Sequence, residues 1–143
     1  MPDTVSRPPK APQTLDLAAP PDDVNSVHAL LEAVWAAHED VGPIDRISFE
    51  TALIELASNV IRHGDDGDGV VCSVTVDVTE DRIEARLIDS GPRGDIQLSR
   101  SELPDELAES GRGIPLITAL VDVVRYEHDA DGNRWFLSRR RSG

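Results

Sequence analysis

The alternation of apolar and polar residues along the chain predicts three amphipathic helices and a sheet. The clearest helical stripe runs from Phe49 to Gly64, where apolar side chains recur every three or four residues. A glycine just past the last turn commonly ends a helix, so we expect this one to stop at Gly64. Its predicted core face is Phe49, Ala52, Leu53, Leu56, Ala57, Val60 and Ile61.

Two further helices are predicted, one on each side of this stretch. The first runs from Pro21 to Glu39, and Asp22 and Asp23 stand at its start, where the positive end of the helix dipole favours acids. Its inner face is Val27, Leu30, Leu31, Val34 and Trp35. The other opens at Gly111-Arg112-Gly113, with Pro115 in its first turn, where a missing N–H costs little. Its inner face is Ile114, Ile117, Leu120 and Val121.

Period-two alternation and turn residues predict five strands. They are a short strand at Thr14–Leu17, a hairpin of Val70–Val78 and Arg82–Ile88, and a closing hairpin of Val123–His128 and Asn133–Arg139. The order strand, helix, helix, hairpin, helix, hairpin is typical of an α/β (α+β) two-layer sandwich. We therefore expect a mixed, largely antiparallel sheet covered on one face by about three helices.

Length and charge limit what the chain can do. Its 143 residues fit one domain, predicted over residues 14–143, and the proline-rich, aperiodic residues 1–13 are predicted to be a flexible tail. Fourteen Lys and Arg stand against 27 Asp and Glu, a net charge of −13. Such a surface repels a phosphate backbone, which argues against direct nucleic-acid binding. It suits either a partner with a basic patch or simple solubility.

Cysteine and histidine usage indicates a cytoplasmic protein without an all-protein metal centre. The single cysteine, Cys72, allows no internal disulfide, fits a reducing compartment and is expected to be buried and inert. There is no signal peptide and no apolar run that could span a bilayer. The four histidines lack metal-ligand spacing, and the acidic loop Asp65–Gly69 lacks the twelve-residue calcium-loop pattern, so it is read as a turn.

Three short motifs could carry chemistry. Glu55 and Asn59 are one turn apart on the central helix, which places a carboxylate and an amide oxygen over one patch. The bland alternative is a solvated helix face. Asp89 follows a strand and precedes Ser-Gly-Pro, so it could accept a hydrogen bond from an exocyclic amine such as adenine N6, while Gly91 lets a flat base approach. The alternative there is an ordinary turn.

The third motif, Gly111-Arg112-Gly113 at a helix start, forms an anion site of backbone N–H groups. Its spacing fits neither the dinucleotide fingerprint nor the P-loop. Between the last two motifs lies the charged stretch Arg93–Ser110, and a loop of that length is usually either a functional lid or disordered.

The three motifs in this order resemble the GHKL superfamily of ATP-binding domains. Glu55-Leu-Ala-Ser-Asn59-Val-Ile-Arg-His63-Gly64, Leu87-Ile-Asp89-Ser-Gly91-Pro92 and Glu109-Ser-Gly111-Arg112-Gly113-Ile114 are most similar to the anti-sigma-factor serine/threonine kinases. The resemblance covers nearly everything from Thr14 to about Leu137. The chain carries no phosphoacceptor-histidine helix pair, which excludes a complete histidine kinase.

The resemblance implies a role for each motif residue. Asn59 would be the Mg²⁺ ligand, and Glu55 the catalytic carboxylate that orients the attacking hydroxyl and receives its proton. Asp89 would read adenine beside Gly91, and Gly111 and Gly113 would line the triphosphate of ATP. Arg93–Ser110 would be the ATP lid. Three arginines are candidates for offsetting phosphate charge and are not ranked: Arg93, Arg100 and Arg112.

The chain also departs from the family at two places. Gly132-Asn133-Arg134 stands where many members carry a threonine pair that supports adenine through water. Pro115 stands where a bulkier residue is commoner. Both departures bear on how tightly nucleotide is held.

The implied function is an ATP-dependent anti-sigma factor that sequesters a sigma factor and phosphorylates Ser or Thr of a STAS-domain anti-anti-sigma partner. One alternative is a nucleotide-binding regulatory switch with little or no kinase activity, and another is a degenerate copy of the fold that has lost ATP. Because related kinases often dimerise, a homodimer is expected. The identities of the sigma factor and of the antagonist do not follow from the sequence.

Overall fold

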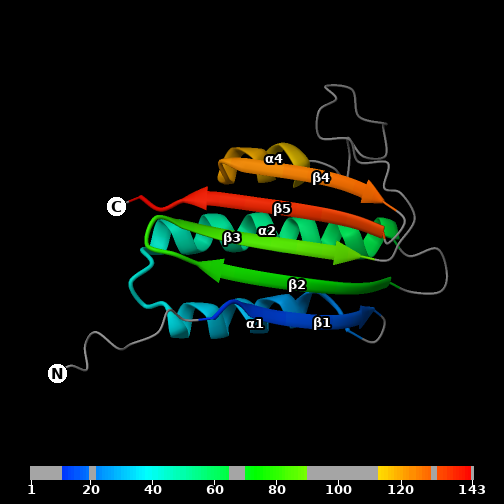
Figure 1. Cartoon of the computed structure of the whole chain (residues 1–143), viewed down its shortest axis with the longest axis horizontal. Coiled ribbons are helices and arrows are strands. Elements are labelled where there is room, and N and C mark those ends of the chain that lie inside the picture. The colour runs from blue at the N-terminus through cyan, green and yellow to red at the C-terminus, as the bar shows by residue number, and fades with distance from the viewer. Residues whose placement is uncertain (1–10, 20–21, 65–69, 90–112, 130–131, 143) are drawn as a thin grey trace.

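The computed structural model describes residues 11–19, 22–64, 70–89, 113–129 and 132–142, and they form two layers (Figure 1). One layer is a five-stranded sheet in the order β1-β2-β3-β5-β4, with every neighbouring pair antiparallel. The strands are β1 (Gln13–Ala19), β2 (Val70–Val78), β3 (Arg82–Asp89), β4 (Val123–Asp129) and β5 (Gly132–Arg140). The helices α1 (Val24–Ala37), α2 (Pro43–Gly64) and α4 (Gly113–Leu120) lie on one face of it. This confirms the predicted sandwich.

Strict alternation in the central strands places the core between the sheet and α2. The buried members of β2 and β3 face the helices: Val70, Cys72, Val74, Val76, Ile83, Ala85, Leu87 and Asp89. From α2, the stripe residues Phe49, Leu53 and Leu56 are each at most 1% exposed. Phe49 also meets Trp35 of α1 edge-on, with ring centroids 6.5 Å apart. The predicted core faces of the first two helices are confirmed, except that Ile61 is only half-buried.

Two helix starts differ from those expected. Helix α1 begins at Val24, because Asp23 is its N-cap and accepts a 2.9 Å hydrogen bond from the Asn25 amide. Asp22 precedes the helix and accepts from the Ala18 amide instead. Helix α2 begins at Pro43, well before Phe49, since proline suits the first helical position.

Smaller boundary differences concern the strands and the last helix. The strands β1, β3, β4 and β5 each extend slightly beyond the predicted limits, and α1 ends at Ala37 rather than Glu39. Helix α4 begins at Gly113 and ends at Leu120, so Val121 lies just past it and is nonetheless buried. The predicted opening at residues 111–112 lies outside the described residues.

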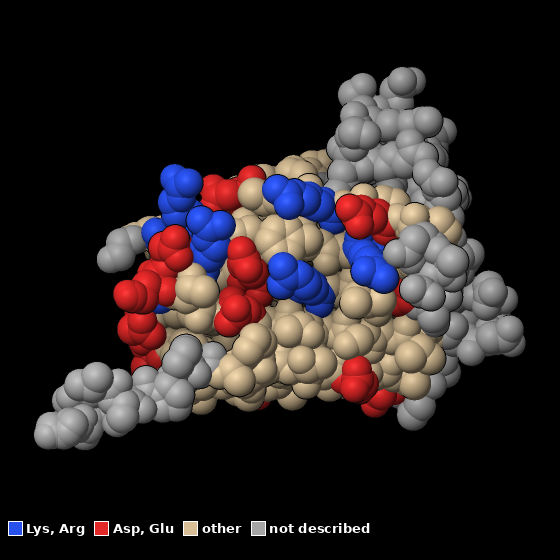
Figure 2. Space-filling model, viewed as in Figure 1, with Lys and Arg blue, Asp and Glu red and all other residues tan. Residues whose placement is uncertain are grey.

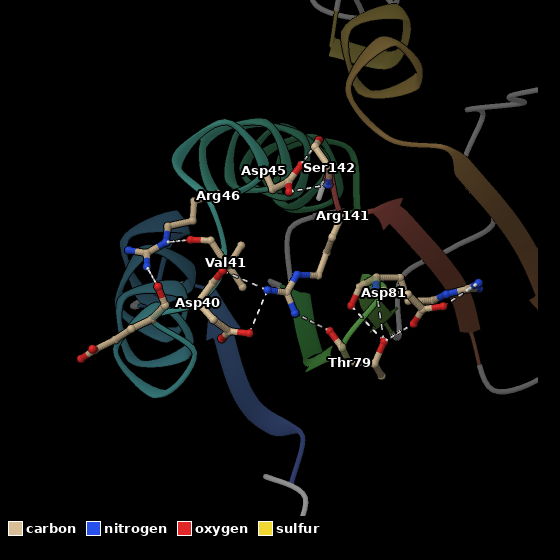
Figure 3. Close-up of polar contacts among 10 residues, drawn as sticks. Asp40, Val41, Asp45, Arg46, Thr79, Asp81, Arg141 and Ser142 are labelled. Carbon is tan, nitrogen blue, oxygen red and sulfur yellow. Dashed lines mark hydrogen bonds and ion pairs between the residues drawn. The ribbon is translucent and has the colours of Figure 1, made fainter.

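The end of the chain is fastened to the start of α2 (Figure 3). Asp45 accepts hydrogen bonds from the Ser142 backbone amide at 2.8 Å, the Ser142 hydroxyl at 2.9 Å and Arg139 Nε at 3.0 Å. Beside it, Arg141 donates to the Asp40 carboxylate at 2.9 Å and to the Thr79 carbonyl at 2.7 Å. These contacts hold the last strand against the loop before α2. No helix in the described part of the chain is long and apolar enough to cross a membrane.

Candidate nucleotide site

The candidate site lies on one side of the molecule, where helix α2 and strand β3 end and helix α4 begins. Figure 1 shows the C-terminal end of α2, the C-terminal end of β3 and the start of α4 all directed to that side. Helix α4 packs against α2, and α2 contacts β3 and β5. The fold therefore brings the described members of the three motifs, which are Glu55, Asn59, Asp89 and Gly113, to one side of the sheet, on its helix-covered face.

Asn59 is buried, which contradicts the alternative that Glu55 and Asn59 lie on a solvated helix face. Asn59 is only 1% exposed, whereas Glu55 and Ser58 are half-buried and Arg62 is exposed. Its Oδ1 accepts a hydrogen bond from Arg62 Nη2, one turn further along the helix. Its Nδ2 is buried and has no partner among the described residues. A buried amide left half-satisfied is costly, and such a group calls for an explanation.

Asp89 is also buried, at 3% exposure, as the last residue of β3. It shares the helix-facing side of the strand with Leu87 and lies opposite Asn133 of β5. Asn133 Nδ2 donates a 2.9 Å hydrogen bond to Asp89 Oδ1. Asn133 Oδ1 in turn accepts from the Tyr126 hydroxyl and lies 3.0 Å from His128 Nδ1. The carboxylate is thus held at a fixed position by a network from the last hairpin.

Cys72 of β2 lies opposite Asp89 on the other flank of β3. Burial raises the pKa of its thiol to about 12, and the negative charge of Asp89 adds to the effect. A thiol with that pKa stays protonated near neutral pH and is a poor nucleophile. The expected burial of Cys72 is confirmed.

The remaining predicted site residues are placed only in part. Glu55 is half-buried, and no described residue forms a hydrogen bond or ion pair with its carboxylate. Gly113 is the first residue of α4. The predicted lid Arg93–Ser110 and the residues Gly91, Arg93, Arg100, Gly111 and Arg112 lie outside the described residues.

The structure adds Arg62 and Asn133 to the candidate site. Arg62 follows Asn59 by three residues and so shares its side of the helix, a spacing that could have indicated the contact. Asn133 is a polar residue at an inward position of β5, alternating with the buried Trp135 and Leu137. Its place opposite Asp89 depends on the strand register, which the sequence motif alone does not contain.

The donor groups suit a magnesium nucleotide. A neutral amide oxygen is a hard ligand of the kind Mg²⁺ accepts, and one protein oxygen suffices when phosphates and water complete its octahedron. The orphaned Nδ2 of Asn59 marks a buried polar position that a ligand could satisfy. At the end of β3, the fixed Asp89 carboxylate is an acceptor suited to an exocyclic amine.

Comparisons with known proteins agree with this description. The fold defines an antiparallel α+β domain of the two-layer sandwich class. The family described as the histidine kinase-like ATPase domain matches residues 17–138, and the chain belongs to it. No curated protein sequence gives a significant match.

Two of the similar solved structures align with most of the chain. A structure of the RsbU and RsbW domains of Rv1364c from Mycobacterium tuberculosis aligns with 93% of this chain at 23% identity and a TM-score of 0.66. This chain spans only 32% of that longer chain. The catalytic domain of histidine kinase ThkA aligns with 90% of this chain and 97% of its own, at 13% identity and a TM-score of 0.54. At these identities the two alignments show only that the chain shares the fold of both structures.

Proposed function

We propose that the chain is a cytoplasmic, ATP·Mg²⁺-dependent anti-sigma factor that phosphorylates Ser or Thr of a STAS-domain antagonist. The observation that carries nucleotide binding is the buried Asn59 amide, whose nitrogen lacks a hydrogen-bond partner among the described residues. Asn59 and the buried Asp89 both lie on the helix-covered face of the sheet. Membership of the histidine kinase-like ATPase family supports it. The three motifs quoted above support the anti-sigma subtype, and the fold match to a chain with an RsbW domain is in keeping with it.

Each residue has a defined part in this proposal. Asn59 would hold Mg²⁺ through Oδ1, which requires Arg62 to release that oxygen and leaves its guanidinium available to phosphate oxygens. Bound Mg²⁺ supplies charge compensation for the phosphates. Asp89 would accept a hydrogen bond from the adenine amine. Gly91, Gly111, Arg112 and Gly113 would complete the nucleotide contacts.

Transfer itself asks mainly for alignment. Phosphoryl transfer is catalysed largely by positioning and electrostatics, so a sparse site is sufficient. Glu55 is one turn before Asn59 on α2, and its carboxylate would orient the incoming hydroxyl and accept its proton. Its half-exposed position leaves it accessible to a protein substrate.

The test is a γ-phosphate transfer assay on STAS proteins from the same cell, combined with calorimetry for ATP and Mg²⁺. Glu55→Gln should bind ATP like the unaltered chain and lose transfer. Glu50→Gln is the matched control on the same helix, because glutamine can still accept the 3.0 Å hydrogen bond from Trp35 Nε1. It should keep both properties.

The outcomes separate the alternatives. Full transfer by Glu55→Gln would remove Glu55 from its assigned role. ATP binding without transfer to any STAS protein would favour the regulatory switch. No heat on ATP addition would indicate a degenerate copy of the fold.

A further inference from the structure

The face of the sheet turned away from the helices carries an arginine patch. Figure 2 shows Arg side chains over the middle of this face, across β3, β5 and β4, with acidic side chains beside them. The register places Arg86 and Arg125 directly opposite Phe136 from its two sides. Their guanidinium carbons lie 5.1 Å and 5.7 Å from the centroid of the Phe136 ring. A net charge of −13 makes such a patch unexpected on this chain.

The two arginines are arranged to receive anions. No described carboxylate lies within ion-pair distance of Arg86 or Arg125, although Arg82 on the same strand pairs with Asp81 at 3.6 Å and with Glu84 at 3.8 Å. Two positive groups stacked on one ring repel each other. A stacked guanidinium still presents its N–H edge, which pairs bidentately with a carboxylate.

Apolar surface lies beside these charges. A hollow of about 280 Å³ is lined by Arg86, Arg125 and Phe136 together with Ile88, Glu127, Arg134 and Trp135. Ile88 is 42% exposed within it. The hollow therefore offers an aromatic and aliphatic floor, with the guanidinium groups and the single carboxylate of Glu127 at its sides.

We infer that this patch docks an acidic segment of a protein partner, with carboxylates on Arg86 and Arg125 and an apolar side chain over Phe136 and Ile88. Charge complementarity selects this occupant. A second copy of the chain docked through the same face would bring like charges together, because a two-fold interface opposes a patch to itself. A nucleic acid is disfavoured because its continuous row of phosphates would extend past the patch onto acidic surface, whereas a short acidic segment needs only the patch itself. This surface is on the opposite face of the sheet from Asn59 and Asp89, so the inference does not require ATP binding.

The test begins with a displayed library of short random peptides, selected on the full chain without nucleotide. Enriched peptides should carry net negative charge and at least one large apolar residue. The best peptide is then measured by fluorescence anisotropy against the unaltered chain, R86Q/R125Q and the matched control R82Q. The double variant should bind at least about tenfold more weakly, since buried or stacked arginines dominate interfaces. R82Q should stay within about twofold, as expected for an exposed ion pair.

Amide chemical shifts of the unaltered chain give a reading that does not depend on any variant folding. On peptide addition they should move in β3, β4 and β5 and leave α2 unmoved. The inference is overturned if the enriched peptides are neutral or basic, if R86Q/R125Q binds them equally, or if the shifts lie elsewhere. Tighter binding of an oligothymidylate than of the acidic peptide would assign the patch to nucleic acid instead.

Discussion

Helix α2 buries a polar side chain near each of its ends, and the two side chains differ in how fully their hydrogen bonds are satisfied. Near its start, Asp45 is 4% exposed and accepts three hydrogen bonds, from Ser142 and Arg139. Near its end, Asn59 is 1% exposed and keeps an amide nitrogen with no partner among the described residues. One helix thus carries a completed polar cluster and an incomplete one.

This difference indicates that the Asp45 cluster stabilises the fold and that Asn59 serves ligand binding. A buried donor without a partner costs about 1–3 kcal/mol, so folding alone gives no reason to keep it. A ligand with an oxygen that accepts the missing hydrogen bond gives such a reason. The Asp45 cluster, by contrast, needs nothing further and joins the last strand to α2 (Figure 3).

The largest expected effect is on stability at the completed end. Asp45→Ala leaves Arg139 half-buried without its carboxylate and releases Ser142, so we expect the free energy of unfolding to fall by about 3 kcal/mol. Urea denaturation measures it. Asp16→Ala, on the exposed side of β1, should change stability by at most about 0.5 kcal/mol. Equal small losses in both variants would show that the cluster contributes little.

The contribution of Asp45 to the free energy of unfolding should depend on pH. Burial works to raise the pKa of Asp45, but hydrogen bonds from Ser142 and then Arg139 outweigh it and hold the pKa below the usual 3.8. The unfolded chain therefore takes up the proton first. The difference in stability between the unaltered chain and Asp45→Ala should be full above the usual pKa and shrink as the pH falls through the lowered value in the folded state.

A substitution at Asn59, near the end of α2, should have the opposite consequences: a small change in stability and a large loss of ligand affinity. Asn59→Ala removes an unsatisfied buried group, so the free energy of unfolding should change by no more than about 1 kcal/mol. Affinity for Mg²⁺·ATP should nevertheless fall by about 10- to 100-fold, as for lost metal-site groups. Calorimetry on this variant and on Asn25→Ala, an exposed asparagine of α1, makes the comparison. Unchanged affinity in Asn59→Ala would contradict the metal assignment.

The sequence was sufficient for most of the fold because each element carries its own periodicity. The stripe from Phe49 to Val60 and the alternation of Val70–Val78 are local patterns that the packing then follows. Helix starts depend on finer chemistry. Asp23 could be read either as a first-turn acid or as an N-cap, and only its bond to the Asn25 amide decides between them.

The site was predictable to the extent that it consists of motifs. The order of motifs singles out Asn59 and Asp89, but their burial comes from the packing of α2 and α4 and from the sheet. Asn133 stands at a departure from the family pattern, and strand register alone brings it to Asp89. Contacts between residues far apart in the sequence are what local patterns leave undetermined.

The smallest expected effect concerns the choice of base at the end of β3. Asp89→Asn keeps an oxygen that can accept from Asn133 Nδ2, so the strand pair should survive. The side chain loses its charge, and with it the stronger hydrogen bond to an adenine amine. We expect ATP affinity to fall about tenfold relative to GTP affinity, since a charge-assisted bond is replaced by a neutral one. Glu84→Gln, on the other face of the same strand, should leave that ratio unchanged. Equal losses for both nucleotides would assign Asp89 to joining β3 to β5, which would place the end of β3 with Asp45 among the structural clusters.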